Sequence, residues 1–501
     1  MSELVHLDGR DVRVALTLTA DVVVVGSGPA GATVARALGA AGVDVAVLEE
    51  GFEARPEDFE ASGVRALARL YRDMGTSIAF GKAPMPFLQG RAVGGTSVVN
   101  GAICWRFPRE TLDDWARTDP ALAEALPFDE IERAQDEIDQ RLGVASTDPA
   151  IAGPKNLLLG TGAEALGVAH RPIRRNVEGC VGAGRCLQGC PHGHKLSMDR
   201  TFLRDAVAHG ARIYAGTTAK AVHVEGGRAV AVLAESAAGA RVGVRARHAV
   251  VLAASAIQTP CLLIASGLRH GPVGRNLAAH PGVSVTARFD EPVRNHLGAT
   301  QGHEVIGWRG EGLKLEALGF DLSILASRLP GAGRELGRRI AEMDHYAVWG
   351  AALRAGARGD VSPGVGRASV RYSLTREDVA LARRGVRVLA DTFFAAGARE
   401  VYPGVAGFPP VLGDPRDAAT IESDAPLDAR AYAMSMTHLF GTARMGSDPA
   451  RSVVRPDFRH HRVDGLYVVD SSVFPGNLGV NPQIPIMALA RLAADRIRAR
   501  S

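Results

Sequence analysis

Three glycines and a glutamate near the N-terminus have the types and the spacing needed to bind a phosphate-containing dinucleotide. Gly26, Gly28 and Gly31 form the pattern Gly-x-Gly-x-x-Gly, and Glu49 follows after a further apolar run. The first glycine permits a tight turn, the second lets the backbone approach a pyrophosphate, and the third lets a helix pack closely on a strand. The glutamate can accept a hydrogen bond from a ribose hydroxyl. We therefore predict a dinucleotide site here.

The residues around these glycines favour a strand, a helix and a second strand, which would position them. The four valines at 22–25 form an apolar, β-branched run that is typical of a parallel strand buried on both faces. Residues 32–41 are rich in alanine and favour a helix, whose N-terminus would present N–H donors to phosphates. A second apolar run at 43–48 ends at Glu49. This order predicts an α/β fold that binds a dinucleotide, and the alternative interpretation is a glycine-rich turn in some other α/β fold.

A second glycine-rich stretch, at 90–101, carries Gly94, Gly95, Thr96 and Asn100. Its glycines would let the backbone approach a flat ligand closely, and its polar side chains offer hydrogen bonds. The stretch lacks the spacing of a Walker phosphate-binding loop. By itself it is equally well explained as a loop that binds nothing.

Three of the five cysteines, Cys180, Cys186 and Cys190, are spaced Cys-x5-Cys-x3-Cys, with His192 and His194 close behind. Three thiolates and a histidine could hold an iron–sulfur cluster or another metal ion. Ordinary structural cysteines in a glycine-rich loop are the third interpretation. The residues leave these three alternatives open.

The composition indicates a globular protein of at least two domains. The chain has 501 residues, of which 46% are hydrophobic and 22% are charged, and its formal net charge is +4. This length exceeds one typical core. A small net charge without a basic, aromatic-rich tract gives no support for nucleic-acid binding. We predict no secretion signal and no transmembrane segment, so we expect a cytoplasmic protein.

The order of apolar runs predicts a discontinuous nucleotide-binding domain formed by residues 1–150, 196–284 and 431–501. Residues 151–195 would form a separate region that contains the cysteine loop. Residues 285–430 show alternating segments that favour an antiparallel sheet, followed by a helical pattern at 376–396. We expect this last part to be a substrate-binding domain.

The sequence resembles the glucose–methanol–choline (GMC) family of FAD oxidoreductases over nearly its whole length. Besides the N-terminal pattern, four stretches occur in the order found in that family: GRAVGGTSVVN at 90–100, SAIQTPCLLIASGL at 255–268, HLFGTARMG at 438–446 and DGLYVVDSSVFPGNLGVNPQIPIMALA at 464–490. The resemblance implies a Rossmann-like FAD-binding domain and a second α+β domain built on an antiparallel sheet. Several separated binding stretches suit a long flavin cofactor, whereas a nicotinamide enzyme needs only the first one.

The resemblance also implies which residues contact FAD. Gly26, Gly28 and Gly31 would hold the pyrophosphate, and Glu49 the adenosine ribose. The other contacts implied by the family are Gly94, Gly95, Thr96 and Asn100 beside the isoalloxazine and ribityl groups, Val222 at the adenine, Asp470 at the ribityl or pyrophosphate region, and Asn481 with Pro482 at the pyrimidine end of the flavin.

The chemistry implied by the family is the oxidation of a small-molecule alcohol to an aldehyde or ketone. A hydride passes to flavin N5, and electrons then pass to oxygen, a quinone or a redox protein. His438 matches the histidine that faces the flavin and is expected to act as the base, while Asn481 would orient the substrate hydroxyl. The alternatives are an FAD-containing lyase of the same family and a nicotinamide-dependent dehydrogenase. The cysteine spacing also resembles that of cluster-bearing members, although other members have a similar loop without a known cluster.

Overall fold

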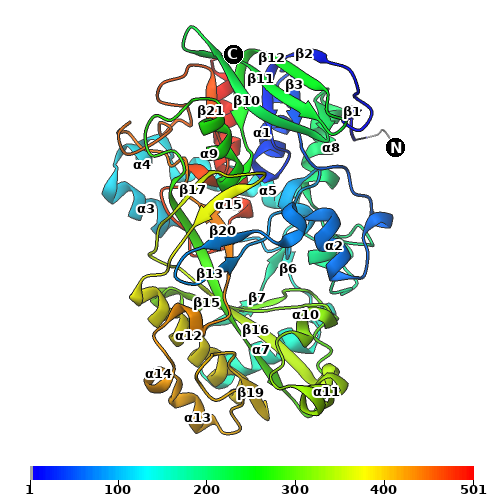
Figure 1. The fold of residues 1–501 in the computed structure, drawn as a ribbon, viewed down its shortest axis with the longest axis vertical. Helices are drawn as coiled ribbons and strands as arrows, with labels where there is room; N and C mark the ends of the chain where they lie inside the picture. The colour runs from blue at the N-terminus through cyan, green and yellow to red at the C-terminus, as the bar shows by residue number, and fades with distance from the viewer. Residues whose placement is uncertain (1–3, 501) are drawn as a thin grey trace.

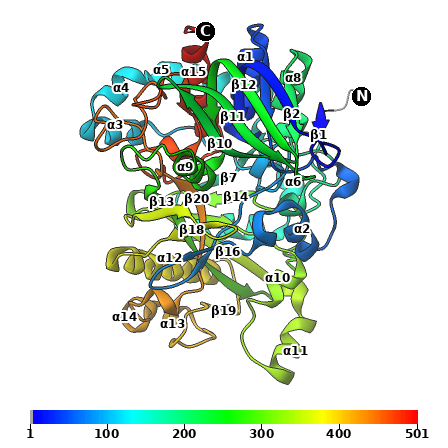
Figure 2. The ribbon, with the colours of Figure 1, turned by 45° about the horizontal axis from the view of Figure 1, so that its top comes forward.

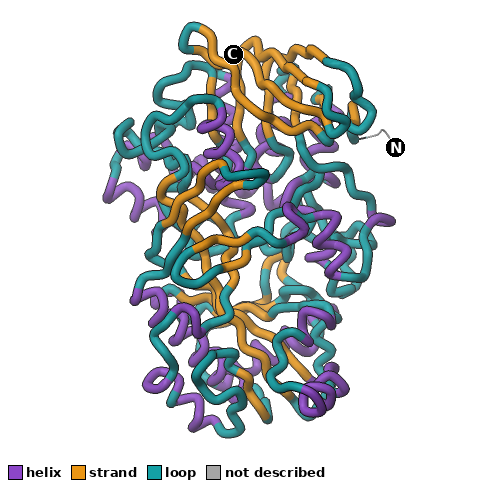
Figure 3. Tube along the Cα trace, viewed as in Figure 1, coloured by secondary structure: helices purple, strands orange, loops and turns teal. Residues whose placement is uncertain are grey.

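A computed structural model describes residues 4–500 as two sheets with helices packed around them. Figure 1 shows the first sheet near the two chain termini and the second sheet toward the opposite end of the molecule. Strand β13 (Arg275–Arg288) extends from one part to the other. Figure 3 shows strands through the middle of the molecule and many of the helices toward its outside. The site described below lies between the two sheets.

The first sheet has the strand order β1-β9-β3-β2-β12-β11-β10, and β21 pairs with β12. Its central pairs are parallel, with Val22–Val25 of β2 opposite Val45–Leu48 of β3 on one side and Ala249–Leu252 of β12 on the other. These runs are buried on both faces, which explains why the sequence carries continuous valine there. The strands are β1 (Leu7–Asp8), β2 (Leu16–Val25), β3 (Val45–Leu48), β9 (Arg212–Ala215), β10 (Thr217–Glu225), β11 (Arg228–Ser236), β12 (Arg241–Leu252) and β21 (Leu466–Val468).

The helices of this part share one hydrophobic core with the sheet. Helix α1 packs against α15 and α8, and α15 also packs against α5. Their buried faces are dominated by alanine, leucine and isoleucine, which allow close approach to the valine strands. The helices are α1 (Pro29–Ala40), α3 (Arg109–Thr118), α4 (Ala121–Ala125), α5 (Phe128–Arg141), α8 (Phe202–Ala208), α9 (Ser255–Ala265) and α15 (Gln483–Arg498).

The second sheet is mixed and mostly antiparallel, with the order β5-β4-β18-β17-β13-β16-β15-β14-β7 and with β19 and β20 paired to β13. Its strands are β4 (Ile78–Phe80), β5 (Met85–Pro86), β7 (His170–Pro172), β13 (Arg275–Arg288), β14 (His303–Val305), β15 (Leu313–Ala317), β16 (Tyr346–Leu353), β17 (Gly359–Pro363), β18 (Ala368–Arg371), β19 (Glu400–Tyr402) and β20 (Ser435–Phe440). A separate two-stranded sheet pairs β6 (Ala145–Ser146) with β8 (Arg174–Arg175).

Helix α12 (Arg376–Ala395) packs against β16 and β13 of the second sheet (Figure 2). A capping box at Thr375 and Asp378 starts this helix, as expected for a threonine followed three residues later by an acid. The remaining helices are α2 (Gly63–Leu70), α6 (Pro149–Ala152), α7 (Pro154–Ala165), α10 (Leu322–Ala326), α11 (Gly333–Ala341), α13 (Pro415–Ala419) and α14 (Ile421–Asp424). Within residues 4–500, no helix combines the length and the apolar character needed to cross a membrane.

The fold class predicted from the sequence is confirmed, but the second sheet extends beyond the predicted substrate domain of 285–430. Strands β4, β5, β7 and β20 and most of β13 lie outside that range. Short strands such as β4 and β7 pair with strands far away in the sequence, β18 and β14, so no local periodicity indicates that they belong to this sheet. The predicted separate region 151–195 also joins this sheet, because it contributes β7 and helix α7 packs against α12.

Candidate functional site

A cavity of about 780 Å³ lies between the two sheets and joins most of the predicted site residues. One wall is the turn Gly26–Pro29 with Glu49, and another is the loop that contains Gly95, Thr96 and Asn100. His438 and Asn481 line the same space. The cradle predicted for a dinucleotide and the two predicted catalytic residues therefore open into one chamber.

The glycines of the first turn are required for three different steric reasons. Gly26 has φ of +100°, and a Cβ there would lie 2.4 Å from the Ala253 carbonyl oxygen. A Cβ on Gly31 would lie 1.9 Å from the Gly26 oxygen, so this glycine permits α1 to pack on β2. A Cβ on Gly28 would meet only the Gly95 Cα, at 3.9 Å, and would otherwise project into free space. Gly28 therefore keeps room for a group outside the chain.

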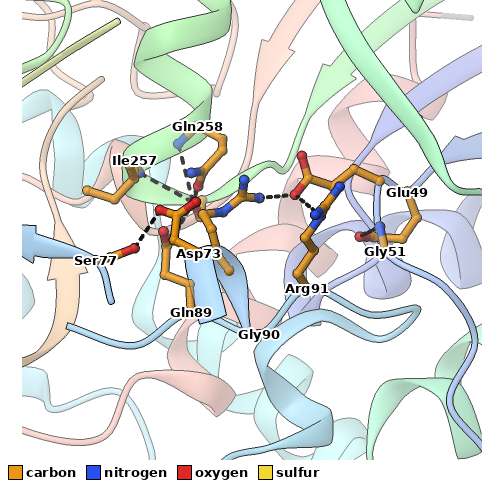
Figure 4. Close-up of polar contacts among 12 residues, drawn as sticks. Glu49, Gly51, Asp73, Ser77, Gln89, Gly90, Arg91, Ile257 and Gln258 are labelled. Atoms are coloured by element: carbon orange, nitrogen blue, oxygen red, sulfur yellow. Dashed lines mark hydrogen bonds and ion pairs between the residues drawn. The ribbon is translucent and has the colours of Figure 1, made fainter. Parts of the chain in front are cut away.

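Glu49 is buried at the end of β3 and holds the glycine turn from behind. Its Oε2 accepts hydrogen bonds from Ser27 N at 3.0 Å and Ser27 Oγ at 2.6 Å, and its Oε1 accepts from Gly51 N at 2.8 Å. Figure 4 shows this carboxylate turned toward the backbone of Gly51. Burial raises the pKa of Glu49, and these hydrogen bonds oppose the rise. Oε1 accepts only one of these hydrogen bonds and therefore retains acceptor capacity for a further donor.

The second glycine-rich loop is tied directly to the first. Gly94 N donates to Ser27 Oγ at 2.9 Å, and a Cβ on Gly95 would lie 2.8 Å from Gly28 Cα. Thr96 Oγ1 accepts from Gly90 N at 3.0 Å. Asn100 Nδ2 donates to Gln483 Oε1 at 2.5 Å, which links the loop to the start of α15. Gly94 itself supports the loop and does not line the cavity.

Asp470 follows β21, lines the cavity and organises the start of α9. Its carboxylate accepts from Ser255 N at 2.9 Å, Thr259 Oγ1 at 2.5 Å and Ser472 N at 2.8 Å. Burial raises the pKa of Asp470, while the hydrogen bonds from Ser472 and Thr259 oppose this rise. Ser255 has φ of +92°, which is strained for a residue other than glycine. Strain of this kind is characteristic of functional sites.

Two glutamines that line the cavity have polar atoms without a partner among the described residues. Gln483 Nε2, beside Pro482 at the N-terminus of α15, is buried without an acceptor, and Gln89 Oε1 is buried without a donor. Gln89 Nε2 donates to Ser255 Oγ at 3.0 Å and Gln258 Oε1 at 3.2 Å (Figure 4). Buried polar groups in proteins are almost always hydrogen-bonded. These two atoms therefore fit a polar ligand in the cavity.

Val222 is a predicted cofactor contact that lies in a hydrophobic core and, like Gly31 and Gly94, does not line the cavity. The residues of β10 that line the cavity are Thr217, Thr218, Ala219 and Lys220. A register shift between Ala219 and Ala221 changes the face that the following residues present. The Val222 N–H donates to Ser266 Oγ at 2.8 Å instead.

His438 is positioned by a second histidine that the sequence analysis did not identify. His438 has φ of +50° in β20, and its Nδ1 lies 3.0 Å from Nδ1 of His280 in β13. Gly479 N donates to His280 Nε2 at 2.9 Å. Because a backbone N–H can only donate, the proton of neutral His280 must be on Nδ1, from which it is donated to His438. Neutral His438 then carries its own proton on Nε2.

Both histidines are neutral at neutral pH. Burial, assisted by the charge of Lys314, lowers the pKa of His438 to about 3. Burial and the neighbouring His438 and Lys314 lower the pKa of His280 well below its usual value. Desolvation disfavours the imidazolium form, and a nearby cation adds to this effect.

Asn481 is fixed by a buried ion cluster on β14 and β15. Lys314 Nζ donates to Asn481 Oδ1 and contacts Glu304 Oε2 at 3.2 Å and Glu316 Oε1. Because the ammonium donates to the amide oxygen, the Asn481 Nδ2 group is left as the donor toward the cavity. Glu304 also accepts from Trp105 Nε1 at 2.7 Å, so the cluster is held on several sides.

Sequence reasoning thus missed His280, Lys314 and Gln483. Lys314 is one of only five lysines in the chain, at 82, 155, 195, 220 and 314, and its rarity was a signal that could have drawn attention to it. His280 and Lys314 lie in strands whose pairing is long-range, so nothing in their local sequence connects them with His438 or Asn481.

Two of the three cysteines of the loop lie against a buried arginine. No group of three or more histidine, cysteine, aspartate or glutamate side chains in residues 4–500 is arranged to hold a metal ion. The guanidinium of buried Arg175 lies against Cys186 Sγ at 3.2 Å and Cys180 Sγ at 3.9 Å. A fixed cation in this position competes with a metal for the sulfur atoms. The contact with Arg175 is one that structural cysteines would make at Cys180 and Cys186, and the iron–sulfur and metal interpretations of the three cysteines, Cys190 included, stay predictions.

Comparisons with known proteins agree with this geometry. Two family models, both described as GMC oxidoreductase, match residues 22–282 and 358–490. The chain belongs to the GMC oxidoreductase family. An uncharacterized GMC-type oxidoreductase of Mycobacterium tuberculosis is 36% identical over 484 residues, which cover 96% of this chain and 76% of that protein. A long-chain-alcohol oxidase of Arabidopsis thaliana is 27% identical over 521 residues, which cover 96% of this chain and 68% of that protein.

Solved structures show the same fold for this GMC oxidoreductase. Pyridoxine 4-oxidase from Mesorbium loti has a TM-score of 0.72 and 18% identity, over 96% of this chain and 100% of that chain. A formate oxidase of Aspergillus oryzae has a TM-score of 0.73 and 17% identity, over 97% and 99%. The family is FAD-dependent, and the open space at Gly28 with the unpartnered atoms of Gln89 and Gln483 fits such a cofactor. The turn Gly26–Pro29 would hold its pyrophosphate.

Proposed function

We propose that this GMC oxidoreductase oxidises an alcohol to an aldehyde or ketone with FAD as cofactor. The observation that carries the proposal is that one cavity connects the cradle at Gly26 with the side chains of His438 and Asn481. When bound, FAD supplies a hydride acceptor at flavin N5. Oxygen, a quinone or a redox protein then receives the electrons. The long-chain-alcohol oxidases among the relatives support an alcohol substrate.

In the proposed reaction, His438 and Asn481 hold the hydroxyl group of the substrate. The amide oxygen of Asn481 accepts from Lys314, so Asn481 Nδ2 is free to donate a hydrogen bond to the hydroxyl oxygen of the substrate. The positive charge of Lys314 behind this amide also favours negative charge on that oxygen. Both effects lower the barrier to removing the hydroxyl proton.

His438 is the proposed base, and the histidine pair determines when it can act. In the resting arrangement Nε2 of His438 is protonated, because Nδ1 accepts from His280. For His438 Nε2 to be unprotonated, the proton shared between the two rings must be bonded to Nδ1 of His438. Neutral His280 must then carry its own proton on Nε2. That change breaks the hydrogen bond from Gly479 N. We propose that substrate binding makes this tautomer accessible, and that His438 then accepts the hydroxyl proton at Nε2.

The test is anaerobic reduction of the purified, FAD-loaded protein by a panel of primary and secondary alcohols. An alcohol substrate bleaches the visible absorbance of the flavin and yields an equivalent amount of carbonyl product. A lyase would convert its substrate without net bleaching. If no alcohol in the panel bleaches the flavin, while dithionite does, the proposal of alcohol oxidation fails.

A further inference from the structure

One face of the second sheet forms a wall of the cavity and leads away from His438. On β13, His280, Gly282 and Ser284 alternate and therefore point to the same side. Ala352 and Gly350 of β16 lie directly opposite Gly282 and Ser284. The small residues of this wall, Gly282, Gly350 and Ala352, all line the cavity. The cavity therefore extends along this wall from His438 to the Ser284 end of the strand, where Leu318 lies over Gly350.

An arginine stands at the Ser284 end of this wall. Arg328 follows α10 and lines the cavity with Ser284, Leu318 and Phe320. Its Nη1 donates to Ser284 Oγ, and its guanidinium lies over the Phe320 ring, 5.1 Å from the centroid. Its Nε is buried and has no acceptor among the described residues. The guanidinium is therefore held in place by neutral groups.

The charge of Arg328 is not balanced by the part of the chain that the structure describes. No carboxylate there lies within 4.0 Å of its nitrogen atoms. Glu316 belongs to the same wall, but its oxygens are engaged by Lys314 and by Gln301 Nε2 at 2.7 Å. Burial lowers the pKa of Arg328, which reflects the same lack of a counter-charge. A partly buried cation without an anion is unfavourable unless a ligand supplies one.

Arg72 and Arg367 also line the cavity, but the charge of each is either paired with a carboxylate or exposed to water. Arg72 contacts Glu50, which neutralises it. Arg367 is exposed at the β17–β18 hairpin, where water screens its charge. Arg328 combines burial, a fixed orientation and an unbalanced charge, and these are the properties of a residue that recognises an anion.

We infer that Arg328 determines substrate specificity by binding an anionic group, such as a carboxylate, at the end of the substrate remote from the reacting hydroxyl. This inference rests on the proposed function, which places the hydroxyl at His438 and Asn481. Ser284 lies four positions after His280 on β13, which is roughly 13 Å along the strand. An extended chain advances by about 3.3–3.6 Å for every three bonds. A linear hydroxy acid with roughly ten to twelve bonds between its two ends matches this span.

The experiment compares 10-hydroxydecanoate with 1-decanol and with methyl 10-hydroxydecanoate, using the FAD-loaded full chain. We expect kcat/KM to be about 10- to 100-fold higher for the hydroxy acid than for the two neutral alcohols. Arg328→Gln should remove this preference by lowering kcat/KM for the hydroxy acid to about the value for 1-decanol. Arg328→Lys should retain part of the preference, and Arg367→Gln, the matched control, should retain all of it. Melting curves identify any variant that fails to fold.

A second readout does not depend on turnover. Decanoate, which has no hydroxyl group, should bind to the wild-type protein in calorimetry and lose about 10-fold or more in affinity in Arg328→Gln. Equal binding of decanoate by wild type and Arg328→Gln overturns the role of Arg328. Equal kcat/KM for the acid and the neutral alcohols also overturns it, but leaves alcohol oxidation intact. Decanoate binding that depends on Arg328, without flavin reduction by any alcohol, would support the anion site and refute the proposed function.

Discussion

Replacing His438 with alanine should separate catalysis from cofactor binding. Proton transfer by a positioned side chain contributes about 10²- to 10⁴-fold to a rate, and each factor of ten corresponds to about 1.4 kcal/mol of barrier. We therefore expect His438→Ala to lose about 3–6 kcal/mol of transition-state stabilisation. FAD content should stay unchanged, because the hydrogen bonds of the glycine turn run to Glu49 and Gly94 and not to His438.

The structure also gives the side effect of this substitution. His438→Ala leaves the buried Nδ1–H of His280 without its acceptor, which costs about 1–3 kcal/mol of folding stability. His170→Ala is the matched control. It removes a similar contact between two histidines, because His170 Nδ1 lies 2.9 Å from His303 Nε2, and neither residue lines the cavity.

The assay measures the rate of anaerobic flavin bleaching and the ratio of flavin to protein absorbance in both variants. Both should lose thermal stability, and only His438→Ala should lose turnover. Turnover of His438→Ala within threefold of wild type, with full FAD content, would refute the role assigned to this histidine.

Three further predictions concern the residues around this centre. His280→Leu removes the donor that keeps Nε2 of His438 protonated. Since one hydrogen bond contributes about 1 kcal/mol, we expect kcat to rise by about fivefold and the pH profile of kcat to shift. A purely structural role of His280 would lower only the melting temperature. Gly28→Ala should fold normally but lose FAD, because its methyl group would enter the open space that the cofactor needs. Gly31→Ala should destabilise the protein itself, because its Cβ would lie 1.9 Å from the Gly26 oxygen. Equal melting temperatures for the two variants would contradict this reasoning. Acidification should destabilise the fold between pH 6.5 and about pH 4. In the folded chain the pKa of His303 and of His460 is lowered to about 4 and that of His438 to about 3, so in this range the unfolded chain binds protons that the folded chain does not. A free energy of unfolding that stays constant in urea titrations across this range would contradict the prediction.

Local sequence patterns were sufficient to predict the nucleotide-binding half of the fold. The valine run at 22–25, the three glycines and the second apolar run specify a strand, a turn and a strand because each conformation depends on residues adjacent in the chain. The extent of the second sheet could not be predicted this way. Strands such as β7 and β20 are short, and their partners in β14 and β13 are far away in sequence.

The sequence by itself determined the family-like motifs, the glycine cradle and the candidates His438 and Asn481. The tertiary structure alone decided what these two side chains can do. His280 lies 158 residues from His438, and Lys314 lies 167 residues from Asn481. These contacts fix which nitrogen carries a proton and which end of an amide faces the cavity. A motif records the type of a side chain, whereas its protonation and orientation depend on neighbours that only the folded chain brings within hydrogen-bond distance.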